Sequence, residues 1–592
     1  MDTLQNDRQK RRYGVCFFIL WAAQMAAAFY FCTQKQGFHE DELYTYYSTA
    51  RTNGFYVENG KWMDRETYRN EFVVLPDERF QYGLVKQVQS WDVHPPMYYW
   101  VFHTVASFVP GVFSKWIGLS VNLFFHGINL LLLVRLTYLV SGKDERLALL
   151  VNLVYGFTPA AMSGVVFIRM YEMLTTFVLL CAILHVRVVR AAECGNNSGM
   201  ARGRTHVLSA ATLLAMAAVT YAGFLTQYYY FIFLFFLAAA FCLWLLRRDK
   251  NVRNCLRYAV AQGLAFGLAY LTYPAFPGQM FRGQRGAQAT KNFFDISNTF
   301  ERLRFFFDLM NGYVFGYLLL VILLTVAVLA VGTHRQSGGK SAFWMLLFTA
   351  AGYFLAVSKT ALLLGNTSNR YQLPVYGIVV LLAFYACKTL WGQAVFLFDA
   401  KRVPGEEPGR PERRYRQCLS FFKTFLPGLE WIGGLFRRFV GFLVRHRKMT
   451  EKAAVLFCLA LLVSGYLCVD VVFLYPGAEE ERARAREQAA EGIPVVYVYQ
   501  PGEEWCIWAV ADVLMEYERV YFIAADSEAP ITEPAIVNAG ELVAYLPQDD
   551  WENGEGQLAR IAASCHALEA HLQYSHPYCE SCYFYMTEAW KP

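Results

Sequence analysis

Apolar windows long enough to cross about 30 Å of membrane hydrocarbon as helices recur along almost the whole chain. Hydrophobic residues make up 56% and aromatic residues 17% of the 592 residues, above the apolar share of an ordinary soluble protein. The windows lie near residues 14–32, 118–140, 147–168, 171–190, 207–225, 228–246, 254–274, 313–332, 341–361, 371–391 and 453–475. The sequence therefore predicts an α-helical polytopic membrane protein with about 11 spans.

The first window follows the basic stretch "RQKRR" and is either a cleaved signal peptide or a signal anchor. We favour the anchor, with the N-terminus in the cytoplasm, because the chain returns to the membrane repeatedly. Threading the windows from that start places nearly every Lys/Arg cluster inside, as the positive-inside rule requires. We therefore expect a multi-pass plasma-membrane protein in which residues 33–117 and those after Tyr475 lie outside.

Two apolar stretches outside these windows are predicted to be surface helices. Counting residues 96–113 as a twelfth span would move basic loops to the outer side, so we expect a helix on the outer membrane surface, where aromatic residues are enriched. Residues 421–448 carry Arg437 and Arg438 inside an apolar run. That pattern predicts an amphipathic helix on the cytoplasmic face.

Composition divides the chain into three expected parts. They are a membrane core (1–391), a basic amphipathic segment with the last span (392–475), and a small outer α/β domain (476–592). In the last part, "IPVVYVYQ", "RVYFIAA", "LVAYL" and "CYFYM" are typical of strands, and we expect a helix near 556–573. Neither GxGxxG nor GxxxxGK[ST] occurs there, so a nucleotide site has no support and no nucleic-acid partner is expected.

Polar and charged residues gather at four places on the predicted outer side. These are Glu40–Asp41–Glu42, "DVHPP" (92–96), "IRMYE" (168–172) and "NRYQLP" (369–374). Ionisable groups at a membrane boundary are functional candidates, although a single arginine could simply mark the end of its helix. A partly desolvated carboxylate can act as a general base toward a hydroxyl, and arginines can bind a phosphate through forked hydrogen bonds. A phosphate tethered to a lipid would lie at this depth.

The strings "GFHEDELYTYYSTA", "WDVHPPMYYWVFHTVASFVPG", "FIRMYEMLTTF", "TQYYYFIFLFF", "FRGQRG" and "NRYQLPVY" occur in this order. Together they resemble the bacterial branch of glycosyltransferase family 39. These are C-type (GT-C) membrane glycosyltransferases related to protein O-mannosyltransferases and lipid A aminoarabinose transferases. The resemblance covers about residues 1–390 and implies a GT-C-type core with surface helices in its first outer loop. It also implies transfer of a sugar, with inversion, from a polyprenyl-phosphate donor to an envelope glycan, lipid or protein outside the cytoplasm.

The resemblance places the catalytic carboxylates at Asp41 and Glu42, with Asp41 deprotonating the acceptor hydroxyl. Glu40 precedes them, so the residues alone leave three acids competing for the role of base. By the same resemblance, His94 would lie near the donor phosphate and Tyr98 would line the cavity.

Arg169 and Tyr171 fall in an outer turn where the resembled enzymes keep polar site residues. Glu172 either pairs with Arg169 or helps to hold a divalent ion. The sequence leaves metal dependence open, and it implies no other cofactor.

Two further groups are candidates for binding the donor. Arg282 and Arg285 lie in a segment that could close over the lipid head group, although Arg285 could equally be an ordinary exposed arginine. Arg370 and Tyr371 could complete the grip on the phosphate.

The C-terminal domain contains Cys565, Cys579 and Cys582, with His566, His571 and His576 close by. Cysteine and histidine at this spacing can bind zinc. On the oxidising outer side a disulfide is favoured over zinc.

The main rival function is a transporter or flippase for lipid-linked saccharides. Such a protein would be expected to carry polar or Gly/Pro-broken residues in mid-span, or repeated halves, whereas the charges here gather at outer ends. A scaffold protein would leave the acids and arginines unexplained. A polysaccharide polymerase or ligase is chemically nearer and stays open.

Overall fold

The computed structural model describes residues 2–50, 57–197, 208–333, 341–398, 429–502, 505–547, 554–565, 567–576 and 580–587. Contacts divide the chain into two compact units. The first, called the helical unit here, comprises Met1–Phe29, Leu123–Val165 and Met170–Val471. The second, called the α/β unit, comprises Tyr30–Asn122, Val166–Arg169 and Val472–Pro592. The α/β unit thus includes the first predicted outer loop, so it differs in extent from the expected domain 476–592.

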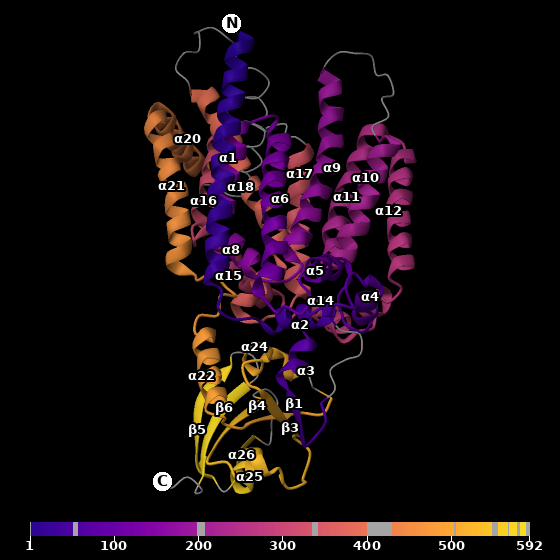
Figure 1. Ribbon diagram of the computed structural model, residues 1–592. Coiled ribbons are helices and arrows are strands. Elements are labelled where there is room, and N and C mark those ends of the chain that lie inside the picture. Colours follow the sequence, from indigo (N-terminus) through magenta and orange to yellow (C-terminus); the bar gives the residue numbers. More distant parts are fainter. Residues whose placement is uncertain are drawn as a thin grey trace, which may run out of the picture. The chain divides into compact units, whose positions relative to one another are not determined.

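Seven of the described helices are long and apolar enough to cross a membrane. They are α1 (Asp2–Gln34), α6 (Lys115–Ser141), α9 (Tyr171–Asn197), α11 (Tyr229–Asp249), α17 (Ser341–Thr360), α18 (Leu373–Phe398) and α21 (Arg447–Cys468). Two bent helix pairs raise the number to nine if each pair is one span. The chain is therefore a multi-pass membrane protein, and Figure 1 shows the long helices of the helical unit running side by side.

The other expected spans coincide with helices that do not pass the same test alone. They are α7 (Glu145–Gly156) with α8 (Pro159–Val166), α15 (Thr299–Phe315) with α16 (Leu319–Thr333), α10 (Ala210–Thr226) and α12 (Arg253–Thr272). Most described residues of every expected window thus lie in helices. By length and composition, however, the structure supports seven to nine spans, because α10 has only 17 residues and α12 is less apolar.

Local sequence explains both bends. The α7–α8 pair bends by 61° just before Pro159, which can begin a helix because its missing N–H needs no partner there. The α15–α16 pair bends by 88° after Gly316, whose φ of 53° lies in the left-handed region that glycine adopts without strain. A Cβ at Gly316 would also come within 2.5 Å of the Leu461 carbonyl oxygen. The bend therefore requires glycine at this position.

The predicted amphipathic helix is present as α20 (Leu429–Arg445), and residues 421–428 lie outside the described residues. Its Val440 and Val444 are buried against a cluster that includes Leu329 of α16 and Ala394 of α18. Its position on a membrane face stays a prediction. The remaining described elements of the helical unit are α13 (Phe276–Phe281), α14 (Gln284–Phe294) and the 3₁₀ helix η1 (Gly365–Tyr371).

Four short helices precede α6 in the α/β unit: α2 (Glu40–Ala50), α3 (Arg65–Asn70), α4 (Tyr82–Trp91) and α5 (Met97–Ser107). The expected helix over 96–113 is therefore α5, with 11 residues. At about 1.5 Å per residue it is too short to cross about 30 Å of hydrocarbon, which agrees with a helix that does not span the membrane.

The α/β unit contains a six-stranded mixed sheet with the order β1-β3-β2-β4-β6-β5. The strands are β1 (Lys61–Asp64), β2 (Val495–Tyr499), β3 (Arg519–Ala524), β4 (Glu541–Pro547), β5 (Ala567–His576) and β6 (Glu580–Thr587). The central strand β2 is parallel to β3 and β4, and the outer pairs are antiparallel. The described helices of this part are α22 (Ala478–Ala490), α23 (Trp505–Ala509), α24 (Ala511–Leu514), α25 (Pro534–Val537) and α26 (Gly554–Ser564).

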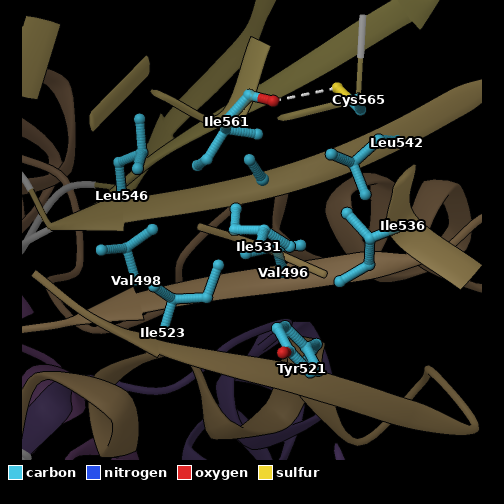
Figure 2. Packing of buried hydrophobic residues seen from close by; sticks show 11 residues of the cluster. Val496, Val498, Tyr521, Ile523, Ile531, Ile536, Leu542, Leu546, Ile561 and Cys565 are labelled. Atoms are coloured by element: carbon cyan, nitrogen blue, oxygen red, sulfur yellow. Dashed lines mark hydrogen bonds between the residues drawn. The ribbon is translucent and has the colours of Figure 1, made fainter. Parts of the chain in front are cut away.

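Helix α26 covers one face of the sheet. Val496 and Val498 of β2 point into a buried cluster that also holds Ile561 and Cys565 of the α26 region (Figure 2). Helix α22 is tied to the start of β3, because the hydroxyl of Tyr517, two residues before that strand, donates a hydrogen bond to Gln488 of α22 (2.7 Å). Because β2 is buried along its whole length, its continuous apolar sequence is the pattern expected of a central parallel strand.

Strands β2, β3, β4 and β6 confirm the predicted strand segments, and two other parts of the prediction were wrong. The expected helix near 556–573 ends at Ser564, and its second half is β5, which pairs with β6. Strand β1 was not predicted. It comes from the first loop and pairs with β3, and this long-range pairing fixes a segment whose four residues carry no strand pattern of their own.

Candidate active site

The acidic trio occupies the first turn of α2, where the helix dipole favours negative charge. Glu42 is fully buried there. Its Oε2 accepts hydrogen bonds from Lys35 Nζ (2.9 Å) and the His39 N–H (2.6 Å), and its Oε1 accepts from the Ile168 N–H (2.7 Å). Burial raises the pKa of the Glu42 carboxyl, although Lys35 and the backbone N–H groups lower it. Its bonds join the stretch from Lys35 to Glu42 to the turn of residues 166–169.

Asp41 has a different environment. Its side chain is 21% exposed, and its Oδ1 lies 3.9 Å from Nη2 of Arg169. Nη1 of Arg169 also donates to the Asp41 backbone carbonyl (3.0 Å). Glu40 is also partly exposed. A substrate can therefore reach the carboxylates of Asp41 and Glu40, but it cannot reach the buried carboxylate of Glu42.

Arg169 is almost completely buried and connects several elements. Its Nη1 donates to Thr45 Oγ1 of α2 (3.1 Å) and to the Tyr99 hydroxyl of α5 (3.0 Å), and its Nη2 faces the His94 ring. Several hydrogen bonds to one guanidinium fix its orientation, because its donors lie in one rigid plane. Arg169 therefore holds the first turn of α2 against α5.

His94 lies between an acid and this guanidinium. Its Nδ1 is 3.1 Å from Asp92 Oδ2, and its Nε2 is 3.2 Å from Arg169 Nη2. These partners assign the proton to Nδ1, which donates to Asp92, and leave Nε2 to accept from Arg169. Burial opposes ionisation of Asp92, but His94 and Arg169 outweigh it and hold the pKa of Asp92 below its usual range.

The tyrosines of α5 are buried beside this cluster. Tyr98 is fully buried, and its hydroxyl has no hydrogen-bond partner among the described residues. Tyr99 is equally buried and accepts from Arg169. Burial raises the pKa of both phenols, although Arg169 opposes the shift, so both hydroxyls are protonated at neutral pH. They supply neutral hydrogen-bonding groups and aromatic walls.

The Gly118→Ala variant tests how tightly the 166–169 turn is held. A Cβ at Gly118 would lie 2.0 Å from Cγ2 of Ile168, so the added methyl must push aside this side chain of the turn that carries Arg169. We expect it to cost about 1–3 kcal/mol of stability, the usual range for overpacking. Thermal unfolding of the purified variant measures this. The matched control is Gly83→Ala, where no atom lies within 4 Å, and equal unfolding of both variants would contradict the tight packing.

Tyr171 and Glu172 begin α9 and belong to the helical unit. Glu172 is buried, and its Oε2 accepts from Asn129 Nδ2 (2.7 Å) and lies 3.4 Å from His126 Nδ1. A Cβ at Gly164 would come within 2.7 Å of Glu172 Oε1, so α8 also packs closely on this carboxylate. Tyr171 packs edge-on against Tyr371, with ring centroids 6.1 Å apart.

Arg370 and Tyr371 lie in η1 of the helical unit and are both buried. Nη2 of Arg370 donates to the Tyr371 hydroxyl (3.1 Å), and the Tyr229 ring also packs against Tyr371. Arg282 follows α13 and Arg285 lies in α14, and both side chains are exposed. Of the predicted site residues, the structure thus groups Asp41, Glu42, His94, Tyr98 and Arg169 in the α/β unit, and Tyr171, Glu172, Arg282, Arg285, Arg370 and Tyr371 in the helical unit.

Two residues of the α/β cluster were missing from the predicted site. Lys35 is fully buried against Glu42, and a lysine directly after an apolar window on the outer side is a signal that could have indicated it. Asp92 stands in the "DVHPP" string that we singled out, but only the structure shows its bond to His94.

The described part of the chain contains no group of three His, Cys, Asp or Glu side chains that could hold a metal ion. Of the cysteines near the C-terminus, Cys565 is buried, and its thiol donates a hydrogen bond to the Ile561 carbonyl. His571 is exposed on β5. Cys579 and His566 lie outside the described residues, and only the backbone is described at Cys582 and His576. The zinc and disulfide alternatives stay predictions.

No protein-family model matches this chain, and no curated protein matches its sequence. Among solved structures, ArnT from Cupriavidus metallidurans bound to undecaprenyl phosphate is similar, with 12% identity and a TM-score of 0.48 over 97% of this chain and 99% of that chain. The oligosaccharyltransferase AglB from Archaeoglobus fulgidus, in complex with an inhibitory peptide and a dolichol-phosphate, has 12% identity and a TM-score of 0.41 over 88% of this chain and 69% of that chain. Both are GT-C glycosyltransferases, the class whose motifs this sequence resembles. The TM-scores lie below 0.5, so the architecture follows from this chain's own helices and strands.

Proposed function

We propose that the chain is an inverting glycosyltransferase of a bacterial plasma membrane. It would move a sugar from a polyprenyl-phosphate donor to a hydroxyl of an envelope glycan, lipid or protein outside the cytoplasm. The observation that carries this proposal is the partly exposed Asp41 carboxylate, held by Arg169 in one cluster with His94. A carboxylate that is partly desolvated and fixed by its neighbours suits a general base.

In the proposed step, Asp41 takes the proton of the acceptor hydroxyl while the hydroxyl oxygen attacks the anomeric carbon of the donor sugar. The bond between the anomeric carbon and the phosphate oxygen breaks. Its electron pair stays on the phosphate, and polyprenyl phosphate leaves. Attack from the face opposite the leaving group inverts the anomeric configuration.

The neighbouring residues take supporting roles in this proposal. Glu42 is fully buried in its ion pair with Lys35, so we assign it to positioning the start of α2. Arg169 orients Asp41 through its backbone carbonyl and its carboxylate. His94 is 21% exposed, and in this proposal its ring lies beside the donor phosphate while its two nitrogens hold Asp92 and Arg169 in place.

Cations of the helical unit remain candidates for binding the donor phosphate, as the sequence resemblance implies. Arg282 and Arg285 are exposed, so their guanidinium groups are accessible to a charged lipid head group. Guanidinium binds phosphate through paired, charge-assisted hydrogen bonds. Arg370 is proposed for the same role together with Tyr171 and Tyr371.

The test uses purified protein with a panel of labelled polyprenyl-phosphate hexoses and aminosugars, and an envelope fraction as acceptor. We expect at least one donor to release polyprenyl phosphate in a protein-dependent manner, with the sugar appearing on the acceptor in the inverted configuration. Retention of configuration would contradict the direct displacement. Consumption of none of the donors would contradict the proposed function.

A further inference from the structure

A cavity of about 620 Å³ lies entirely within the α/β unit, and no predicted site residue lines it. Its walls come from the chain around residues 36–38 and 111–116, from α3, from α22 and from the end of α24. This volume falls within the about 300–1,000 Å³ typical of small-ligand sites. The cavity is therefore large enough for a ligand of a few sugar rings.

Two of the four cations that line the cavity are neutralised by acids. Nη1 of Arg482 lies 3.4 Å from the buried Asp512, and Nη1 of Arg486 lies 3.1 Å from Glu516. Both arginines also pair with Glu479. These groups present hydrogen-bond donors and acceptors side by side, an arrangement that suits the hydroxyls of a carbohydrate.

The other two cations have no carboxylate partner among the described residues. The Nε of Arg69 is buried without a hydrogen-bond partner in that part of the chain. Lys115 Nζ donates to the backbone carbonyls of Thr33 and Lys35. The Arg69 guanidinium thus keeps an uncompensated charge at the cavity wall, and an anionic ligand would pair with it. The cavity thus carries positive charge that its own acids do not compensate.

Aromatic side chains provide the apolar part of the lining. Trp116 is 38% exposed in the cavity wall, and Phe38 and Phe113 pack against each other with ring centroids 5.4 Å apart. Phe38 also packs edge-on against Tyr46 of α2 (5.6 Å) and stands three residues before Asp41. One wall of the cavity is therefore continuous with the helix that carries the proposed base.

We propose that this cavity binds a short saccharide bearing a carboxylate or phosphate group, as a docking site for part of the acceptor. The aromatic side chains would face sugar rings, the paired arginines and acids would bind hydroxyls, and Arg69 with Lys115 would bind the anionic group. The acceptor role rests on the proposed function, but binding itself does not require turnover.

Calorimetric titration of the full-length protein in detergent tests this with four probes: trigalacturonate, trehalose 6-phosphate, neutral maltotriose and inorganic phosphate. We expect at least one anionic saccharide to bind about tenfold or more tightly than maltotriose and inorganic phosphate. Tighter binding of trigalacturonate would indicate recognition of a carboxylate, and tighter binding of trehalose 6-phosphate would indicate recognition of a phosphate. Arg69→Met should weaken that binding by about tenfold or more, whereas Arg69→Lys should retain part of it. Lys61→Met, which removes an exposed lysine outside the cavity, should change nothing.

Equal binding of maltotriose would overturn the anionic preference, and equal binding of inorganic phosphate would reduce the cavity to a plain anion site. Unchanged binding by both Arg69→Met and Lys115→Met would place the ligand elsewhere. Measuring the release of polyprenyl phosphate distinguishes failure of this inference from failure of the proposed function. If the saccharide binds but no donor is consumed, the proposed glycosyltransferase function is contradicted and the saccharide site stands. If the donor is consumed but Arg69→Met leaves the KM for the acceptor unchanged, only the role of the cavity in acceptor docking is contradicted.

Discussion

Replacing Asp41 with asparagine is expected to lower the rate of sugar transfer by about 10²-fold or more, the contribution typical of a general base. The amide has nearly the same shape but cannot take up the acceptor proton. The Asp41 carbonyl that accepts from Arg169 belongs to the backbone, so the substitution keeps this contact. Initial rates of polyprenyl phosphate release from a labelled donor, with an envelope fraction as acceptor, measure the effect.

Glu40→Gln is the matched control, because Glu40 is the adjacent acid and is also partly exposed. We expect it to stay within a few-fold of the wild-type rate, and both variants to unfold at nearly the wild-type temperature. If Glu40→Gln instead shows the large loss and Asp41→Asn does not, the base is Glu40.

The Lys35→Met variant is expected to lose about 3–5 kcal/mol of stability, the usual cost of leaving a buried charge without its partner. Lys35 and Glu42 are both fully buried, and Lys35 Nζ also donates to the Phe473 carbonyl (2.6 Å). The variant would leave the Glu42 carboxylate with only its two backbone donors. Denaturant or thermal unfolding of the purified protein in detergent measures this loss.

A second variant separates the charge effect from lost packing. In Lys35→Met with Glu42→Gln, both charges are removed, so we expect part of the stability to return relative to Lys35→Met alone. Lys61→Met is the control for loss of an exposed lysine. Equal stability of Lys35→Met and wild type would show that the ion pair does not hold the start of α2 in place.

Much of the helical architecture follows from the sequence, because a membrane span must bury a continuous apolar run and satisfy its backbone internally. Most described residues of every predicted window lie in helices. The number of spans is less certain from sequence, because a bend such as that at Gly316 turns one apolar window into two helices. The short length of α5 agrees with the charge argument that excluded a span over 96–113.

Long-range pairing limits what sequence patterns could show in the α/β unit. Strands β2 and β3 have apolar, β-branched sequences that predict strands on their own. In contrast, β1 is recognisable only through its pairing with β3, more than 450 residues away. For β5, alanine and leucine favour a helix, and pairing with β6 outweighs that preference.

In the candidate site, too, the sequence identified the segments, but long-range contacts determine the environment of each residue. Motif strings identified the segments of Asp41, His94 and Arg169, and the structure brings these three into one cluster. Sequence could not distinguish the environments of adjacent acids, because the burial of Glu42 depends on Lys35 and on the Ile168 N–H, which is 126 residues away.

Transfer from a doubly labelled donor is the most direct test of the central claim, that this chain breaks the bond between an anomeric carbon and a lipid-borne phosphate. The donor is a polyprenyl-phosphate sugar carrying ³²P in the phosphate and ¹⁴C in the sugar. We expect ¹⁴C to move to the envelope acceptor while all ³²P stays with the polyprenyl chain, and we expect the Asp41→Asn protein to leave both labels on the donor. Movement of ³²P to the acceptor together with ¹⁴C would contradict the account, since the broken bond would then be the one between the phosphate and the lipid.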